Sequence, residues 1–198
     1  MRVKSVMCDI ADYIRRITDK ISDEQVEQVV SILTDAASKS SKVLVTGAGR
    51  SGLVARAFAM RLMHLGFNVY VVGETITPAL EKNDLLIAIS GSGTTRLVVT
   101  AAQIAKEVGA SIVAITSHAE SPLGRLADYL MIIPGRSKVA KEEDYNARQM
   151  LGEHEPLAPL GTLFEVTTMI FLDGVITELM YRLGRTEKDM LSRHAVIE

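Results

Sequence analysis

Five short runs of apolar residues, separated by helical patterns, most strongly constrain what this chain can fold into. They lie at residues 42–46, 69–72, 85–90, 112–116 and 129–133. A strand that is apolar throughout is buried on both faces, which is typical of a parallel sheet with helices on each side. The sequence therefore predicts an α/β fold, a doubly wound five-stranded parallel sheet flanked by helices.

Helical patterns fill the intervals between these runs and precede the first of them. Apolar residues recur every three or four positions over residues 3–21, 51–65 and 96–108. A further helix is expected to open at Ser22, which begins a capping box. The helices at 51–65 and 96–108 are each followed by a glycine, the residue that commonly terminates a helix.

The chain of 198 residues is expected to form a single domain. We divide it into N-terminal helices at 1–40, an α/β core at 41–134, a long loop at 135–160 and a C-terminal helix and tail at 161–198. The loop is charged and long for a connection, and loops of this size are often functional.

Composition argues against several classes of protein. The net charge of -2, without a basic stripe, predicts no nucleic-acid partner. The most apolar long segment, residues 163–183, contains four charged residues, too many for a membrane span. A single cysteine, Cys8, cannot form an intramolecular disulfide, which favours a reducing compartment. We therefore expect a cytoplasmic protein that carries no signal peptide and has no membrane partner.

The stretch VLVTGAGRSG at residues 43–52 places G-x-G-x-x-G between the first predicted strand and a helix. Ligands of open α/β sheets bind at such strand ends, and a helix N-terminus attracts anions. Gly49, Arg50 and Ser51 are accordingly candidate ligands of an anion. Two alternatives stay open: the glycines serve only a tight turn, or the loop binds a dinucleotide whose ribose contacts Glu74. Arg50 could equally be a solvent-facing cation.

A second loop, SGSGTT, follows the third predicted strand and precedes a helix. It presents four hydroxyl-bearing candidates, Ser90, Ser92, Thr94 and Thr95, together with two glycines. Hydroxyls and backbone amides donate hydrogen bonds to phosphate oxygens, and the helix dipole favours the charge. A helix cap formed by Thr94 or Thr95 is the alternative, but it would explain one hydroxyl and not four. The loop therefore predicts a phosphate monoester site.

The combination of GAGRSG with SGSGTT resembles the sugar isomerase (SIS) domain family. Four further stretches are similar to its 6-phospho-3-hexuloisomerase branch. They are FAMRLMHLGF at 58–67, VGETITP at 72–78, PLGTLFE at 159–165 and RHAVIE at 193–198. The resemblance extends from the first helix to the end of the chain.

The resemblance implies an SIS-type, Rossmann-like fold and an isomerase that interconverts 3-hexulose 6-phosphate and fructose 6-phosphate. It places that reaction in formaldehyde fixation (the ribulose monophosphate pathway) or in pentose supply. Because the sequence shows no metal-ligand spacing and hydrogen-bond donors or cations can hold the developing oxyanion, we expect a metal-independent reaction without a cofactor. The resemblance also implies a homo-oligomer, typically a tetramer, whose active sites are completed by a neighbouring subunit. A non-catalytic phosphosugar-binding module and an NAD-dependent oxidoreductase remain the alternatives.

The reaction moves a ketone from C3 to C2 and needs a base that transfers a proton through an enediolate. Spacing alone favours a capping role for Glu165, because Thr162 precedes it by three residues. The resemblance implies that Glu165 is the base. It also makes His64 a candidate for polarising the substrate oxygens and His194 one for ring opening or proton shuttling. Without the resemblance, His64 would be a partner of a helix C-terminus and His194 a solvated tail residue.

Overall fold

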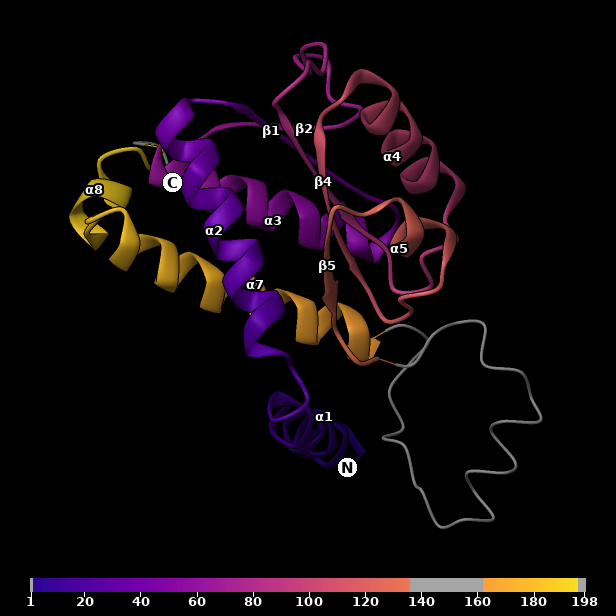
Figure 1. Cartoon of the computed structure of the whole chain (residues 1–198). Coiled ribbons are helices and arrows are strands. Elements are labelled where there is room, and N and C mark those ends of the chain that lie inside the picture. Colours follow the sequence, from indigo (N-terminus) through magenta and orange to yellow (C-terminus); the bar gives the residue numbers. More distant parts are fainter. Residues whose placement is uncertain (1, 136–161, 196–198) are drawn as a thin grey trace.

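The computed structural model describes residues 2–135 and 162–195, and its centre is one parallel sheet (Figure 1). Its five strands run in the order β2-β1-β3-β4-β5. They are β1 (Lys42–Gly47), β2 (Asn68–Val71), β3 (Leu85–Ile89), β4 (Ser111–Thr116) and β5 (Tyr129–Ile132). Every predicted strand bound is met to within one residue, and the predicted fold class is confirmed.

Helices cover both faces of this sheet. Those on one face are α2 (Asp23–Lys39), α3 (Arg50–Leu65) and α7 (Thr162–Arg182), and those on the other are α4 (Arg96–Val108) and α5 (Pro122–Leu126). Helix α1 (Arg2–Thr18) stands away from the sheet and contacts α7, and α8 (Glu187–Leu191) follows α7 (Figure 1). The two shortest helices of the described residues, α5 and α8, were not predicted, because five residues are too few to display a helical period.

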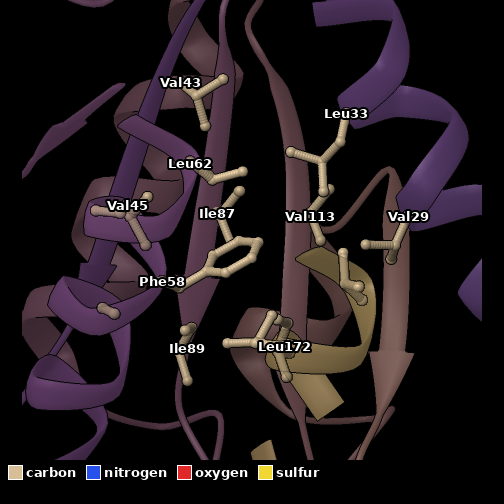
Figure 2. Close-up of a cluster of buried hydrophobic side chains, with 14 of the residues drawn as sticks. Val29, Leu33, Val43, Val45, Phe58, Leu62, Ile87, Ile89, Val113 and Leu172 are labelled. Atoms are coloured by element: carbon tan, nitrogen blue, oxygen red, sulfur yellow. The ribbon is translucent and has the colours of Figure 1, made fainter. Parts of the chain in front are cut away.

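Two apolar layers form the core, one on each face of the sheet. Successive residues of a strand point to opposite faces, so Val43 and Val45 of β1 pack with α2, α3 and α7 whereas Leu44 packs with α4. Figure 2 shows the larger layer, in which Phe58 and Leu62 of α3 lie against the central strands. The uniformly apolar strands therefore reflect burial on both faces, as predicted.

Local signals set the helix ends. The Ser22 hydroxyl accepts a hydrogen bond from Gln25 N at 3.3 Å at the start of α2. Helices α3 and α4 end at Gly66 and Gly109, whose φ angles of 92° and 85° lie in the left-handed region that favours glycine. Both predicted glycine terminations are confirmed. Helix α1 ends at Thr18, three residues before the end of the predicted apolar pattern.

The strand order creates a topological switch point between β1 and β3. The chain leaves β1 toward β2 on one side and returns to place β3 on the other side. Gly47 is paired with Ile89, so the loops that follow these two strands leave the sheet side by side. Ligands of open α/β sheets bind at such a point. Within the described parts of the chain, no helix has the length and apolarity needed to cross a bilayer.

Candidate functional site

The loop after β1 is a close-packed turn. A Cβ on Gly47 would lie 2.6 Å from the Ser51 carbonyl oxygen, and one on Gly52 would lie 3.0 Å from the Gly47 carbonyl oxygen. The sterics of the turn thus account for both of these glycines. Gly49 is the N-cap of α3, with φ at 56°, and Arg50 and Ser51 are the first two residues of that helix. All three candidate ligands therefore sit at the positive end of the α3 dipole.

The loop after β3, residues 90–95, gathers the four predicted hydroxyls, and we term it the hydroxyl loop. Ser90 is buried, and its Oγ lies 3.0 Å from Thr95 Oγ1 and accepts a hydrogen bond from Gly93 N at 3.2 Å. Ser92 Oγ accepts hydrogen bonds from Thr94 N at 3.3 Å and Thr94 Oγ1 at 3.0 Å. Thr95 is the N-cap of α4, but its side chain makes no capping bond. Thr95 therefore occupies the N-cap position that the alternative gave it, but its hydroxyl contacts Ser90 and does not cap the helix.

Two glycines pack this loop against neighbouring helices. A Cβ on Gly91 would lie 2.9 Å from the Phe164 ring, and one on Gly93 would lie 1.9 Å from Ser121 Oγ. Gly93 also has a φ of 64°, which strains any other residue. Because Phe164 directly precedes Glu165, this packing sets the hydroxyl loop beside the start of α7.

Glu165 is a buried carboxylate with a cationic partner. Its side chain is 6% exposed, and it accepts a hydrogen bond from Arg50 Nε in an ion pair that joins the first turns of α7 and α3. The side chain of Arg50 is 55% exposed, so the pair borders solvent. Among the described residues, the Glu165 carboxylate is hydrogen-bonded to Arg50 and not to the backbone of Thr162. Thr162 is already the first residue of α7, whereas a capping box would place it just before the helix. The ion pair therefore replaces the capping box predicted from spacing.

These features form what we term the switch-point cluster: Arg50, Ser90, Ser92 and Glu165. All four residues lie at or beyond the carboxyl ends of β1 and β3, and the N-termini of α3 and α4 lie at the same edge. An anionic ligand there would meet two helix dipoles, serine hydroxyls and a guanidinium. The Glu165 carboxylate beside them could accept a proton.

His64 and His194 occupy a different place, the C-terminal end of α3. Their rings stack with centroids 5.1 Å apart and an interplanar angle of 30°. Arg193 Nη1 donates a hydrogen bond to the His64 carbonyl oxygen at 3.3 Å. Its guanidinium also covers Gly66, where a Cβ would lie 3.1 Å from Arg193 Nη2. Arg193 thus ties the tail to the end of α3, and we term His64, Arg193 and His194 the histidine cluster.

A pocket of about 420 Å³ opens beside the histidine cluster. Its charged lining comprises Arg61, Asp173 and Glu187 in addition to His64 and His194. Fourteen residues of α3 separate Arg50 from His64, which corresponds to about 21 Å along a helix. Within one chain, the structure therefore does not bring the two predicted catalytic histidines to Glu165.

Two further residues emerge that the sequence did not single out. Phe164 packs the hydroxyl loop, and Arg193 holds the tail; both lie inside stretches that carried the family resemblance.

Glu74, the carboxylate of the dinucleotide alternative, instead pairs with Arg56 at 2.9 Å. Residues 136–160 of the predicted loop and residues 196–198 of the tail lie outside the described part of the chain.

Comparison with known proteins places these observations in a family context. The SIS domain model matches residues 37–147. An uncharacterized protein of Aeropyrum pernix is 57% identical over 196 residues, with 99% of this chain and 92% of that protein covered. The 3-hexulose-6-phosphate isomerase of Bacillus subtilis is 37% identical over 198 residues, with both chains covered completely.

A solved structure agrees with these matches. The crystal structure of a protein of Methanococcus jannaschii superposes on this chain with a TM-score of 0.73. A function as 3-hexulose-6-phosphate isomerase was inferred for that protein from its structure. It is 37% identical, and the match covers 98% of this chain and 97% of that one. The similarity therefore includes the elements that carry both clusters.

Proposed function

Because this chain belongs to the SIS domain family and matches 3-hexulose-6-phosphate isomerases over its full length, we propose that it interconverts 3-hexulose 6-phosphate and fructose 6-phosphate. The reaction oxidises C2 from an alcohol to a ketone and reduces the C3 ketone to an alcohol. No external oxidant or reductant is required, which makes the enzyme an intramolecular oxidoreductase. The cytoplasmic location expected from the composition and the homotetramer implied by the family resemblance are parts of this proposal.

The observation that carries the proposal is the ion pair of the buried Glu165 with the half-exposed Arg50, beside the hydroxyl loop at the switch point. A phosphate monoester suits the loop, because hydroxyls, backbone amides and a helix N-terminus all favour its charge. A carboxylate at the same edge of the sheet suits proton transfer at C2 and C3 of a sugar whose 6-phosphate is bound by the loop. The two features together support a sugar phosphate isomerase rather than a binding module alone.

We assign the phosphate to the hydroxyl loop and the chemistry to Glu165. The loop residues Ser90, Ser92, Thr94 and Thr95 donate hydrogen bonds to the phosphate, while Gly49 and Ser51 present the N-terminus of α3 to the substrate. The Glu165 carboxylate takes the proton from C2, and the electrons of that C–H bond form the 2,3-enediolate. The proton of the C2 hydroxyl passes to the C3 oxygen, and the carboxyl group returns the first proton at C3, which leaves the ketone at C2 and the hydroxyl at C3.

Arg50 has two partners in this mechanism. Without substrate it compensates the charge of the buried Glu165 carboxylate. When negative charge develops on the enediolate oxygens, the half-exposed guanidinium is close enough to the base to stabilise them. His64 and His194 are assigned to the substrate hydroxyls, where an imidazole can exchange protons near neutral pH.

Turnover of enzymatically prepared 3-hexulose 6-phosphate tests this function directly. We expect fructose 6-phosphate to accumulate in a coupled assay with the purified chain, and Glu165→Gln to abolish most of that signal. Phosphosugar binding by both proteins without turnover by either would favour the non-catalytic module. A nicotinamide-dependent absorbance change with the wild-type chain would instead favour the oxidoreductase.

A further inference from the structure

Phe164 forms the packing contact between the hydroxyl loop and the first turn of α7. It is buried and directly precedes Glu165. A Cβ on Gly91 would lie 2.9 Å from Cδ1 and 3.0 Å from Cγ of the Phe164 ring. On the other side, a Cβ on Gly135 would lie 2.6 Å from Phe164 Cβ and 2.7 Å from its Cα. The two glycines therefore enclose Phe164 and leave no room for a methyl group at either position.

Backbone conformation does not require either of these glycines. Gly93, in the same loop, has a φ of 64°, whereas neither Gly91 nor Gly135 has a φ in the left-handed region. Alanine can adopt the backbone angles of both positions, so what excludes it is the contact with Phe164. Both glycines thus serve to admit Phe164 rather than to form a turn.

Hydrogen bonds fix both sides of this contact. The Gly91 carbonyl oxygen accepts hydrogen bonds from Ser117 N at 3.0 Å and from Thr116 Oγ1 at 3.3 Å, at the end of β4. The Phe164 carbonyl oxygen accepts a hydrogen bond from Thr168 Oγ1 at 2.7 Å within α7. Close-packed interiors transmit small displacements, because no free volume absorbs them. The ring of Phe164 therefore sets the distance between the hydroxyl loop and the start of α7.

The proposed reaction makes this distance chemically important. The base acts at C2 and C3 of a sugar whose phosphate is on C6. Fructose 6-phosphate also carries an acidic hydrogen on C1, and the pair C1 and C2, which an aldose–ketose isomerisation would use, lies one carbon further from the phosphate. A carbon–carbon bond is about 1.5 Å long, and misplacing a reacting group by about 1 Å can cost about 10²-fold in rate. A base held at a fixed distance from the phosphate can therefore distinguish the two pairs of carbons.

We propose that Phe164 is a positioning residue that sets the distance between the phosphate site and the base, so that Glu165 acts at C2 and C3 of the bound sugar and not at C1. This inference rests on the proposed function, because it assigns the phosphate to the hydroxyl loop and the proton transfer to Glu165. The effect of Phe164 on the reaction passes through Glu165, the next residue of α7.

Gly91→Ala tests the direction of this effect. Its added methyl group meets the Phe164 ring, and since Gly91 is hydrogen-bonded to β4, the ring and the start of α7 move away from the hydroxyl loop, toward C1 of the sugar. Each protein is incubated with fructose 6-phosphate in deuterated water, and NMR follows the entry of deuterium at C3 and at C1. We expect the wild type to label C3 alone, and Gly91→Ala to lower the ratio of C3 to C1 labelling by about 10²-fold. An unchanged ratio in a folded variant would overturn the proposal.

Phe164→Leu tests the same role with a substitution that keeps the core apolar. The matched control is Phe58→Leu, because Phe58 is equally buried in the same core layer and loses the same atoms. Loss of packing alone lowers Tm in both variants. We expect kcat to fall about 10–10²-fold in Phe164→Leu only, with KM unchanged, because the phosphate site stays intact while the base is displaced. A fall in kcat of equal size in both variants, or in neither, would overturn the proposal.

The double variant tests whether the two positions act through their contact. Because Gly91→Ala acts through the ring, it should lower kcat by a smaller factor in the Phe164→Leu background than in the wild type. Equal factors in both backgrounds would show that the methyl group acts on the loop alone, and would overturn the proposal. Wild-type turnover of 3-hexulose 6-phosphate tests the proposed function separately. A wild type without turnover would refute the isomerase, whereas an active wild type with unaffected variants would refute only the role of Phe164.

Discussion

Replacing Glu165 by Gln separates a catalytic from a structural role of this carboxylate. The substitution keeps the size of the side chain and an acceptor oxygen for Arg50, and it removes the charge that could take the C2 proton. Arg50 is half exposed, so its guanidinium can recover hydration when the charge opposite disappears. The change therefore acts on the reaction far more than on the fold.

The structure sets the magnitude of each effect. A pair that borders solvent contributes about 0–1 kcal/mol, and burying neutral Gln costs less than burying a carboxylate. The free energy of unfolding should thus change by about 1 kcal/mol or less, which shifts Tm by about 2–4 °C at this chain length. Loss of a general base lowers kcat by about 10²–10⁴-fold. In barrier height this is about 3–5 kcal/mol, several times the effect on stability.

Two measurements on the same preparations provide the assay. Coupled kinetics with 3-hexulose 6-phosphate give kcat and KM, and calorimetry gives Tm. Arg50→Gln is the matched control, because it leaves the buried carboxylate without its cation and should cost about 1–3 kcal/mol of stability. Wild-type kcat in Glu165→Gln would refute the role of base. A fall in kcat accompanied by a larger loss of Tm than in Arg50→Gln would refute the argument that the charge is dispensable for folding.

Three further changes probe the phosphate loop and the packing of α2 on α7. Ser92→Ala removes a hydroxyl worth about 1.5–3 kcal/mol to a charged ligand, so KM should rise about 10–150-fold with kcat restored at saturation, and an unchanged KM would place the phosphate elsewhere. Gly93→Ala should abolish the rise in Tm that fructose 6-phosphate gives the wild type, because its Cβ would collide with Ser121 Oγ; an equal rise in both would contradict this. Hydrogen bonds from Arg182 and Ser31 lower the pKa of Glu27 from 4.5 to about 2, so the stability it contributes is complete above pH 4.5 and is lost as the pH falls toward 2. In urea unfolding, the advantage of the wild type over Glu27→Gln should accordingly shrink across that range, and a constant difference would refute the assignment.

Local patterns in the sequence determined the elements of this fold. Apolar runs located all five strands, because burial on both faces removes polar residues from the strand itself. Gly66 and Gly109 marked helix ends, because a left-handed residue is required there whatever surrounds it. The sequence also identified the hydroxyl loop, because its residues are consecutive in the chain. Helices α5 and α8 were missed, because five residues do not display a period.

Only the tertiary structure decided which of these elements meet. The order β2-β1-β3 depends on the packing of helices over the sheet, and it makes neighbours of two loops that lie about forty residues apart in the chain. It also pairs Glu165 with Arg50 across 115 residues. The sequence did not predict this contact, because the spacing of Thr162 and Glu165 favoured a capping box instead. The length of α3 could be read from the sequence, but not which of its ends α7 would join. That choice separates Glu165 from His64 within one chain, because a rigid helix holds its two ends about 21 Å apart.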